Sequence, residues 1–345
     1  MKKKKGYFKN FIIFILLIWL TFYILFKDQD VFDILRILKS AKLQFIFAGI
    51  LCMLVYLIFE AINLGRTLKN LNEKSTFWQN IKYSFIGFFF SSITPAASGG
   101  QPMQIYYMYR DNISVGNSTL ALLINLSSMQ VITIGFALIS LFFNYQYLNT
   151  VLIICFIIGI LLNASALTLL VIGIFSKRLS NGLINLVIKI LKLFRVKNIE
   201  GKKELFAKEL NKYQQSSIYI RKNTKMILLT LLTTLVQFTI YYSITYWVYR
   251  ALGFNSYNIM QIITMQSVLF ATVSGIPSPG AVGVSEGAFM EIFRNVYPKN
   301  MISSAVLLNR GINFYLYVLI CGIVTIINHF FYKKRTEDIQ EEKAV

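Results

Sequence analysis

The chain has 345 residues, of which 56% are hydrophobic and 14% charged, and its net charge is +20. Soluble domains rarely reach its mean hydropathy of +0.58, so the composition excludes an ordinary soluble protein and predicts a polytopic membrane protein. Of the 35 Lys and Arg residues, 26 fall in four polar segments, namely 2–9, 66–82, 177–225 and the residues after Tyr332, which is typical of cytoplasmic loops facing anionic lipid rather than of a nucleic-acid-binding protein.

Six apolar runs along the chain predict helices that cross the membrane, which takes about 20 residues of helix. They are 11–26, 43–65, 120–143, 151–175, 226–249 and 301–332. The first run follows a cluster of lysines but precedes no signal-peptidase site, so we expect an uncleaved first helix with a cytoplasmic N-terminus. No run shows the short alternating pattern of a membrane β-barrel. The expected fold class is therefore all-α.

Two polar segments are expected to lie on the membrane surface. Residues 30–42 carry apolar side chains at helical spacing and predict an interfacial helix on the outer side. Residues 177–225 hold thirteen basic and three acidic residues with helical apolar spacing, which predicts an amphipathic cytoplasmic linker. This linker would join a first membrane half, 1–176, to a second, 226–332, with a cytoplasmic tail at 333–345.

Two further segments must each begin and end on one side of the membrane, 77–116 inside and 257–298 outside. Each contains a break rich in proline and glycine, "TPAASGGQP" at 94–102 and "PSPGAVGVSEG" at 277–287, and these hold four of the five prolines. The apolar piece before the first break is too short to span, which predicts a re-entrant hairpin. The second segment leaves a full span and a hairpin both open. Two hairpins of opposite direction would be an inverted repeat.

The two breaks share a pattern that predicts the start of a new helix within the membrane. Thr94 and Ser278 are favourable N-cap residues, and Pro95 and Pro279 suit the first helical position. Free backbone N–H groups at a helix start attract anions, and the nearby glycines allow close approach of a ligand. The pair of breaks therefore predicts a central site for a lipid phosphate, with tight packing turns as the alternative.

Ionisable residues near the breaks add candidates. Arg310 lies well inside the last apolar run and is expected to pair with Glu286 or with a substrate phosphate. Arg110 and Arg294 fit either a site or the membrane interface. Glu60 and Arg66 are expected to form an interfacial pair. The substrate-binding candidates are Thr94, Pro95, Gly99, Gly100, Gln101, Arg110, Ser278, Pro279, Gly280, Gly283, Ser285, Glu286, Gly287 and Arg310.

Catalytic and metal motifs are weak in this chain. Residues 283–287 match G-x-S-x-G, but that motif needs a strand–turn–helix setting and a histidine base, and the single histidine is His329, near the end of the last run. Three scattered cysteines offer no ligand cluster. No catalytic residue, metal or cofactor is expected.

At the two breaks the chain resembles the lysylphosphatidylglycerol synthase transmembrane region, over about residues 8–332. The first family element, T-P-x-x-x-G-G-E, is matched from Thr94 to Gly100, with Gln101 in place of the usual acidic residue. The second, P-x-P-G-x-x-G-x-x-E-G, is matched from Pro277 to Gly287, and Arg310 fits an arginine in the final helices.

The resemblance implies a flippase-like protein of the bacterial cytoplasmic membrane with both termini inside. Its substrate would be a phospholipid, aminoacylated phosphatidylglycerol included, and its action would protect against cationic antimicrobial peptides. Lysyl transfer from tRNA to phosphatidylglycerol, as the family name says, and another lipid-linked transfer remain alternatives, although the soluble transferase domain is not expected before Val345. A separately encoded soluble synthase and further copies of the chain are the expected protein partners.

Overall fold

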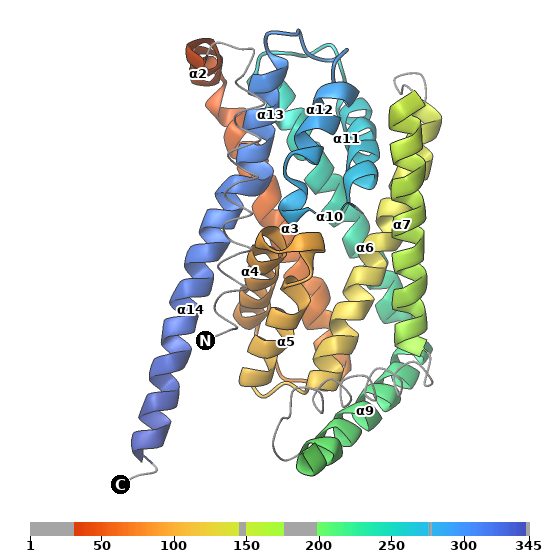
Figure 1. Cartoon of the computed structure of the whole chain (residues 1–345), viewed down its shortest axis with the longest axis vertical. Coiled ribbons are helices and arrows are strands. Elements are labelled where there is room, and N and C mark those ends of the chain that lie inside the picture. Colours follow the sequence, from red (N-terminus) through yellow and green to blue (C-terminus); the bar gives the residue numbers. More distant parts are fainter. Residues whose placement is uncertain (1–30, 145–149, 176–198, 275, 277, 343–345) are drawn as a thin grey trace.

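The computed structural model describes residues 31–144, 150–175, 199–274, 276 and 278–342. Throughout this part of the chain the secondary structure is helical, with no strand (Figure 1). The expected first helix at 11–26, Gly275, Pro277 and residues 176–198 of the linker lie outside the described residues.

Five helical stretches in the described residues are long and apolar enough to cross a membrane. Four are continuous helices, α3 (Leu43–Asn70), α6 (Val115–Asn144), α7 (Thr150–Phe175) and α10 (Thr224–Ala251). The fifth joins α13 (Ile302–Arg310), the π-helical turn η4 (Gly311–Tyr315) and α14 (Leu316–Glu342). This arrangement confirms the predicted all-α polytopic membrane protein.

The two segments with breaks fold as hairpins that approach each other from opposite ends of the bundle (Figure 1). The first consists of α4 (Phe77–Ile93), the 3-10 turn η1 (Pro95–Ala97) and α5 (Gly100–Arg110), and the second of α11 (Ile259–Val273), η3 (Pro279–Ala281) and α12 (Val284–Ile292). Their turns η1 and η3 lie against each other. With 15 residues, α11 is about 22 Å long, which is short of the ~30 Å hydrocarbon core. Of the two alternatives for residues 257–298, a full span or a re-entrant hairpin, the structure shows the hairpin.

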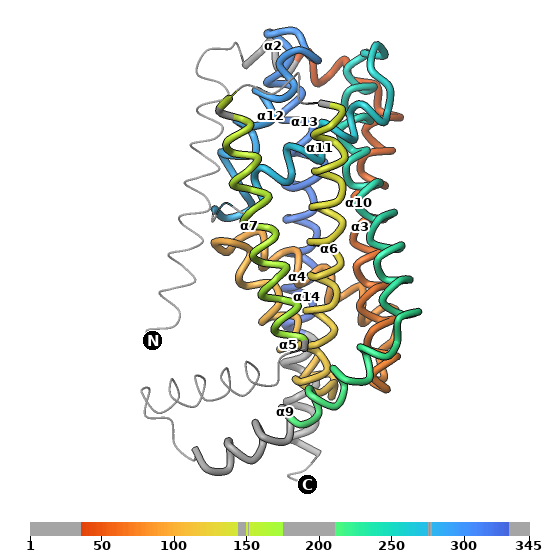
Figure 2. The backbone as a smooth tube through the Cα atoms, turned by 90° about the vertical axis from the view of Figure 1, so that its right-hand side faces the viewer, coloured from red at the N-terminus to blue at the C-terminus, as the bar shows by residue number. Residues whose placement is uncertain are grey.

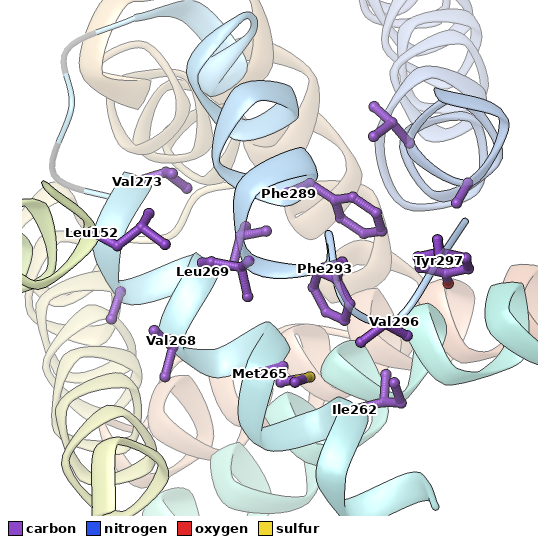
Figure 3. Close-up of a cluster of buried hydrophobic side chains, with 14 of the residues drawn as sticks. Leu152, Ile262, Met265, Val268, Leu269, Val273, Phe289, Phe293, Val296 and Tyr297 are labelled. Carbon is purple, nitrogen blue, oxygen red and sulfur yellow. The ribbon is translucent and has the colours of Figure 1, made fainter. Parts of the chain in front are cut away.

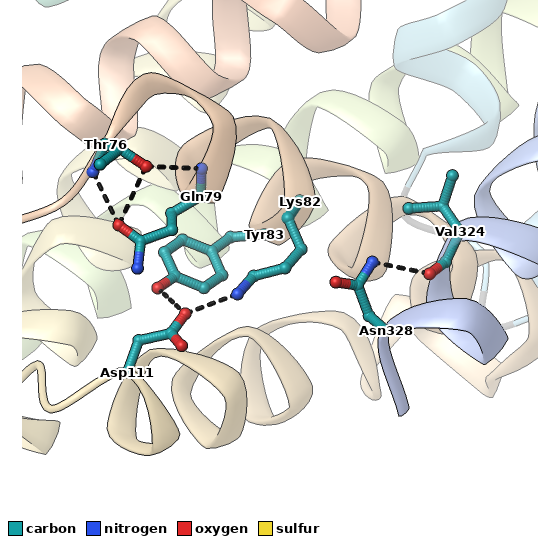
Figure 4. Close-up of polar contacts among 7 residues, drawn as sticks. All are labelled: Thr76, Gln79, Lys82, Tyr83, Asp111, Val324 and Asn328. Carbon is teal, nitrogen blue, oxygen red and sulfur yellow. Dashed lines mark hydrogen bonds and ion pairs between the residues drawn. The ribbon is translucent and has the colours of Figure 1, made fainter. Parts of the chain in front are cut away.

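Each hairpin begins with the same local device. The Thr76 side chain accepts a hydrogen bond from the Gln79 backbone N–H, while the Gln79 side chain accepts one from the Thr76 backbone N–H (Figure 4). Asn258 and Gln261 form the same reciprocal capping box before α11. Such a box satisfies two N–H groups that the helix itself leaves unbonded, so both hairpins have a defined entry point at their outer ends.

Buried apolar side chains hold the second hairpin in place. α11 and α12 pack through Met265, Leu269, Phe289 and Phe293, and Leu152 of α7 joins the same cluster (Figure 3). The Phe289 and Phe293 rings stack with centroids 4.5 Å apart. Burial of these large aromatic and aliphatic side chains is the main stabilisation of the hairpin. It also determines how far the turn η3 extends into the bundle.

The surface helices lie at opposite ends of the molecule (Figures 1 and 2). α2 (Val31–Ser40) is at one end, and α9 (Ile199–Lys222), the described part of the linker, is at the other. The α9 helix is fastened to the bundle by Lys212, which contacts Glu73 at 2.7 Å, and by Ser216, which donates to Asn117 Oδ1 at 2.7 Å.

Candidate functional site

A cavity of about 370 Å³ lies where the two hairpin turns meet. This volume is within the range of small-molecule sites. Both halves of the chain contribute to its wall, through α3, α4, η1, α5, α6 and α7 on one side and α10 to η4 on the other. The polar residues of the wall are Tyr56, Glu60, Ser91, Ser92, Gln101, Gln104, Asn125, Gln130, Thr133, Asn163, Tyr241, Gln266, Ser274, Ser278, Ser285, Asn309, Arg310 and Asn313.

The second break is organised by one arginine. Arg310 Nε donates to Glu286 Oε1 at 2.7 Å, and Arg310 Nη2 donates to the Gly280 carbonyl at 2.9 Å. The other carboxylate oxygen of Glu286 accepts the Gly283 N–H at 2.7 Å. Arg310 is 7% exposed and Glu286 is 2% exposed. The expected pairing of Arg310 with Glu286 is therefore present, and it closes the loop that leads into α12.

The backbone after Arg310 widens into the π-helical turn η4. The guanidinium carbon lies 4.2 Å from the centroid of the Phe314 ring, close enough for a cation–π contact. Tyr315 OH donates to Glu286 Oε1 at 3.4 Å. A π-turn shifts the register of the side chains that follow it and often marks a functional position, and here it places Phe314 and Tyr315 around the ion pair.

The first break is stabilised by hydrogen bonds of the Thr94 hydroxyl, whereas the second is stabilised by an ion pair. Thr94 Oγ1 donates to the Phe90 carbonyl at 2.6 Å and accepts the Gly99 N–H at 2.9 Å. Ala96 and Ala97 have positive φ angles of 51° and 53°, a left-handed conformation that side chains disfavour. The loop therefore turns back sharply before α5 begins, and Gln101 in the first turn of α5 lines the cavity.

The predicted helix starts at Pro95 and Pro279 were wrong. Each proline begins only a single 3-10 turn, and the helices begin later, at Gly100 and Val284. The reason is the left-handed backbone at Ala96 in the first turn and at Gly280 in the second. Neither Thr94 nor Ser278 caps the turn with its side chain. At α12 the carboxylate of Glu286 accepts the Gly283 N–H, so one of the N–H groups at this helix start already has an anionic partner.

Some of the candidate residues line the cavity in the structure, and others do not. Those that line it are Gln101, Ser278, Gly280, Ser285 and Arg310. Those that do not are Thr94, Pro95, Gly99, Gly100, Arg110, Pro279, Gly283, Glu286 and Gly287. Most of the second group shape the two loops. Arg110 lies at the far end of α5, 5.3 Å from the Tyr106 ring centroid, and Arg294 pairs with Glu291.

The expected pair of Glu60 and Arg66 is not formed. Arg66 instead donates to Asn63 Oδ1 at 2.8 Å and to Thr233 Oγ1 at 2.9 Å, whereas Glu60 lies in the cavity wall. They are six positions apart in α3, which places their side chains on different faces of the helix. The sequence signal for Glu60 was its position inside an apolar run, the same signal that identified Arg310.

Most of the uncharged polar wall was also missed. Gln104 donates from Nε2 to Glu60 Oε1 at 3.2 Å and to the Tyr83 carbonyl at 3.1 Å. Thr245 Oγ1 lies 2.9 Å from Gln266 Oε1 and 3.1 Å from Asn309 Oδ1, so its single proton can be donated to either oxygen. Single amides within apolar helices are a weak signal one at a time, since they also serve helix packing. Only the fold shows that they face a common space.

Two comparisons place the chain among known proteins. Residues 9–321 match the family described as the lysylphosphatidylglycerol synthase TM region. The chain is also similar to a UPF0104 membrane protein of Archaeoglobus fulgidus, at 24% identity over 297 residues, which covers 85% of this chain and 89% of the relative.

Proposed function

The chain belongs to the lysylphosphatidylglycerol synthase transmembrane region family, and on this premise we propose that it takes a phospholipid headgroup into the central cavity and moves the lipid between leaflets. The headgroup would be of the phosphatidylglycerol type, aminoacylated forms included. In a bacterial cytoplasmic membrane, with both termini inside, outward movement of a cationic lipid would repel cationic antimicrobial peptides.

The observation that carries this proposal is the buried pair of Arg310 and Glu286 beside a polar cavity between two opposed hairpins. Ionisable residues and irregular backbone are costly at membrane depth, and they persist where they line a pathway or a ligand site. Opposed broken helices around a midplane site are the architecture of many transporters, in which one repeat rocks against the other.

Contact with the lipid phosphate is assigned to Arg310. Its guanidinium stacks on Phe314 and donates from Nε and Nη2 to protein oxygens. A guanidinium has five N–H donors, so donors remain for a phosphate oxygen. Ser278 and Ser285 also line the cavity and would add hydroxyl donors. A separately encoded lipid synthase, or a second copy of the chain, would be a partner outside this site.

The test is lipid translocation in liposomes of phosphatidylglycerol and phosphatidylcholine that contain fluorescent lipid in both leaflets. Dithionite quenches only the outer leaflet, so a working protein takes the quenching beyond about half. A Gln101→Trp variant, which fills the cavity from its wall, should abolish this, whereas Leu138→Trp, on an exposed face of α6, should not. Wild-type protein that leaves quenching at half with every headgroup contradicts the proposal, and new lipid formed on addition of lysyl-tRNA would assign a transferase instead.

A further inference from the structure

Glu60 differs from the other acidic residues whose side chains the structure describes. Glu73, Asp111, Glu286 and Glu291 each form an ion pair with a lysine or an arginine. Glu60 forms none in the described part of the chain, and its carboxylate accepts hydrogen bonds from the uncharged side chains of Gln104 and Ser84. Glu60 lies within a membrane-crossing helix, where a counter-charge matters because a buried charge without one is costly.

Arg310 does not supply the missing partner. Among the described residues that line the cavity, Glu60 and Arg310 are the two that carry charge. The guanidinium of Arg310 is bonded to Glu286, and its positive charge is thereby balanced. When Glu60 is ionised, the cavity wall therefore carries one negative charge that no described residue balances, and a ligand that binds near Glu60 should bring a positive one.

Four aromatic rings of the wall form a cluster that begins one helical turn from Glu60. Tyr56 lies one helical turn before Glu60, and its ring centroid is 4.8 Å from that of Tyr241 and 5.9 Å from that of Phe238. The Tyr241 ring is 5.8 Å from Phe270. All four rings line the cavity. Aromatic faces attract organic ammonium groups, for which clusters of rings form cages, whereas divalent metal ions require several oxygen or nitrogen ligands.

Three unbonded amide oxygens in the wall are also suited to a ligand with hydrogen-bond donors. Asn125 Oδ1, Gln130 Oε1 and Asn313 Oδ1 are buried and have no hydrogen-bond partner in the described part of the chain, and their residues all line the cavity. Amide oxygens are acceptors only. Buried polar groups normally find partners, so these oxygens call for a ligand rich in N–H or O–H donors.

We propose that Glu60, with the rings of Tyr56, Phe238, Tyr241 and Phe270, forms a subsite for an ammonium group of the ligand. The inference rests on the proposed function and deepens it, because the lipid headgroup would carry a primary ammonium that faces Glu60 while its phosphate faces Arg310. Glu286 is not available for this role, because its oxygens are bonded to Arg310 and Gly283.

The experiment compares two short-chain lipids that differ only at the amine, phosphatidylethanolamine and its N-acetyl derivative, in binding to purified full-length protein in detergent. The wild type should bind the free amine about tenfold more tightly, as expected for one charge-assisted contact in a buried site. Glu60→Gln keeps the shape and the bond to Gln104 but removes the charge, and the preference should fall to near unity. Tyr241→Leu should reduce it in part, and a thermal melt of each variant establishes that it folds.

Equal binding of the two lipids by the wild type would overturn the proposed subsite. A preference for the free amine that persists in the Glu60→Gln variant would overturn it as well. Free ethanolamine is the second arm. If free ethanolamine binds as tightly as phosphatidylethanolamine, the ammonium site is one for water-soluble amines. If only the lipid binds, the site is one for the lipid headgroup. The proposed function fails separately, if liposomes show no translocation while the amine preference and its dependence on Glu60 remain.

Discussion

Arg310 Nε lies 2.7 Å from Glu286 Oε1, and the two side chains are only 9% and 3% exposed. Glu286 belongs to the first turn of α12 and Arg310 is the last residue of α13, so the bond joins the second hairpin to the last membrane-crossing stretch. Arg310 also donates a hydrogen bond to the Gly280 carbonyl. Its guanidinium therefore contacts both the turn of the hairpin and the first turn of α12. The geometry of the break therefore depends on this single side chain.

Loss of one partner of this pair should be far worse than loss of both. Arg310→Ala leaves the Glu286 carboxylate buried and unpaired, and we expect it to cost about 3–5 kcal/mol of stability. The double variant Arg310→Met with Glu286→Gln should recover much of that loss while remaining inactive in lipid translocation. Thermal unfolding in detergent and the dithionite assay measure the two effects. Additive losses in the double variant would contradict the pair as a structural unit.

Gly280 should be intolerant of any side chain. Its φ is +58°, and a Cβ atom there would lie 2.1 Å from Cζ of Phe314. Gly280→Ala therefore meets both an unfavourable backbone conformation, which costs roughly 1 kcal/mol or more, and the ring that stacks on Arg310. We expect a lower melting temperature and loss of translocation. Gly135→Ala in α6, where nothing lies within 4 Å, should be neutral or slightly stabilising, as for an ordinary helical position.

The architecture could be predicted from the sequence because it follows from two simple signals. Long apolar runs give spanning helices, and the breaks at Pro95 and Pro279 give opposed hairpins once the polar segments fix their sides. The details of each break could not be predicted. Proline favours a helix start, but the left-handed backbone at Ala96 and Gly280 lies within loops that are closed by bonds from Thr94 to Phe90 and from Arg310 to Gly280, which are made only in the folded protein.

The candidate site was predictable where a charge interrupts an apolar run, and less so elsewhere. The pairing of Arg310 with Glu286 is found in the structure. Glu60 carried the same signal, but Arg66 nearby in the sequence suggested a local pair, and helix geometry directs the two side chains apart. The amides of Asn125, Gln130 and Asn313 resemble ordinary packing residues, and only tertiary structure brings them to one cavity.

The base of the first hairpin should depend on Asp111. Its carboxylate contacts Lys82 Nζ at 2.6 Å and accepts a hydrogen bond from Tyr83 OH, which fastens α5 to α4 (Figure 4). Asp111→Asn should lower stability by about 1–3 kcal/mol, the range for a buried group that loses a charged partner. The matched control is Glu291→Gln, whose exposed pair with Arg294 should matter by less than ~1 kcal/mol. Equal effects of the two variants would contradict the assigned role.

The attachment of α9 should weaken in acid because of Glu73. Burial raises the pKa of Glu73, but hydrogen bonds from Lys212 and Asn117 outweigh burial and hold it below its ordinary value of 4.5. For a depressed pKa the stabilisation is complete above the unfolded value and is lost as the pH falls through the folded one. The wild type should therefore melt higher than Glu73→Gln at pH 7, and the difference should shrink as the pH falls below 4.5. A difference that grows in acid would contradict the contact.

The packing of α7 against the second hairpin offers a test within one helix. A Cβ atom at Gly159 would lie 2.2 Å from the carbonyl oxygen of Ala271 in α11, whereas nothing lies within 4 Å of the equivalent atom at Gly173. Small residues let membrane helices approach closely, and the obstacle here is backbone, which cannot rotate aside. Gly159→Ala should therefore separate α7 from α11 and cost about 1–3 kcal/mol, as overpacking does.

Gly173→Ala changes the same residue type in the same helix and should leave the melting temperature unchanged or raise it slightly. Because Ala271 lies just before the second break, the displaced α11 should also disturb η3 and reduce lipid translocation in the Gly159→Ala variant. If both variants melt and transport alike, α7 is not held at Gly159, and the second hairpin owes its position to the aromatic cluster around Phe289 and Phe293 alone.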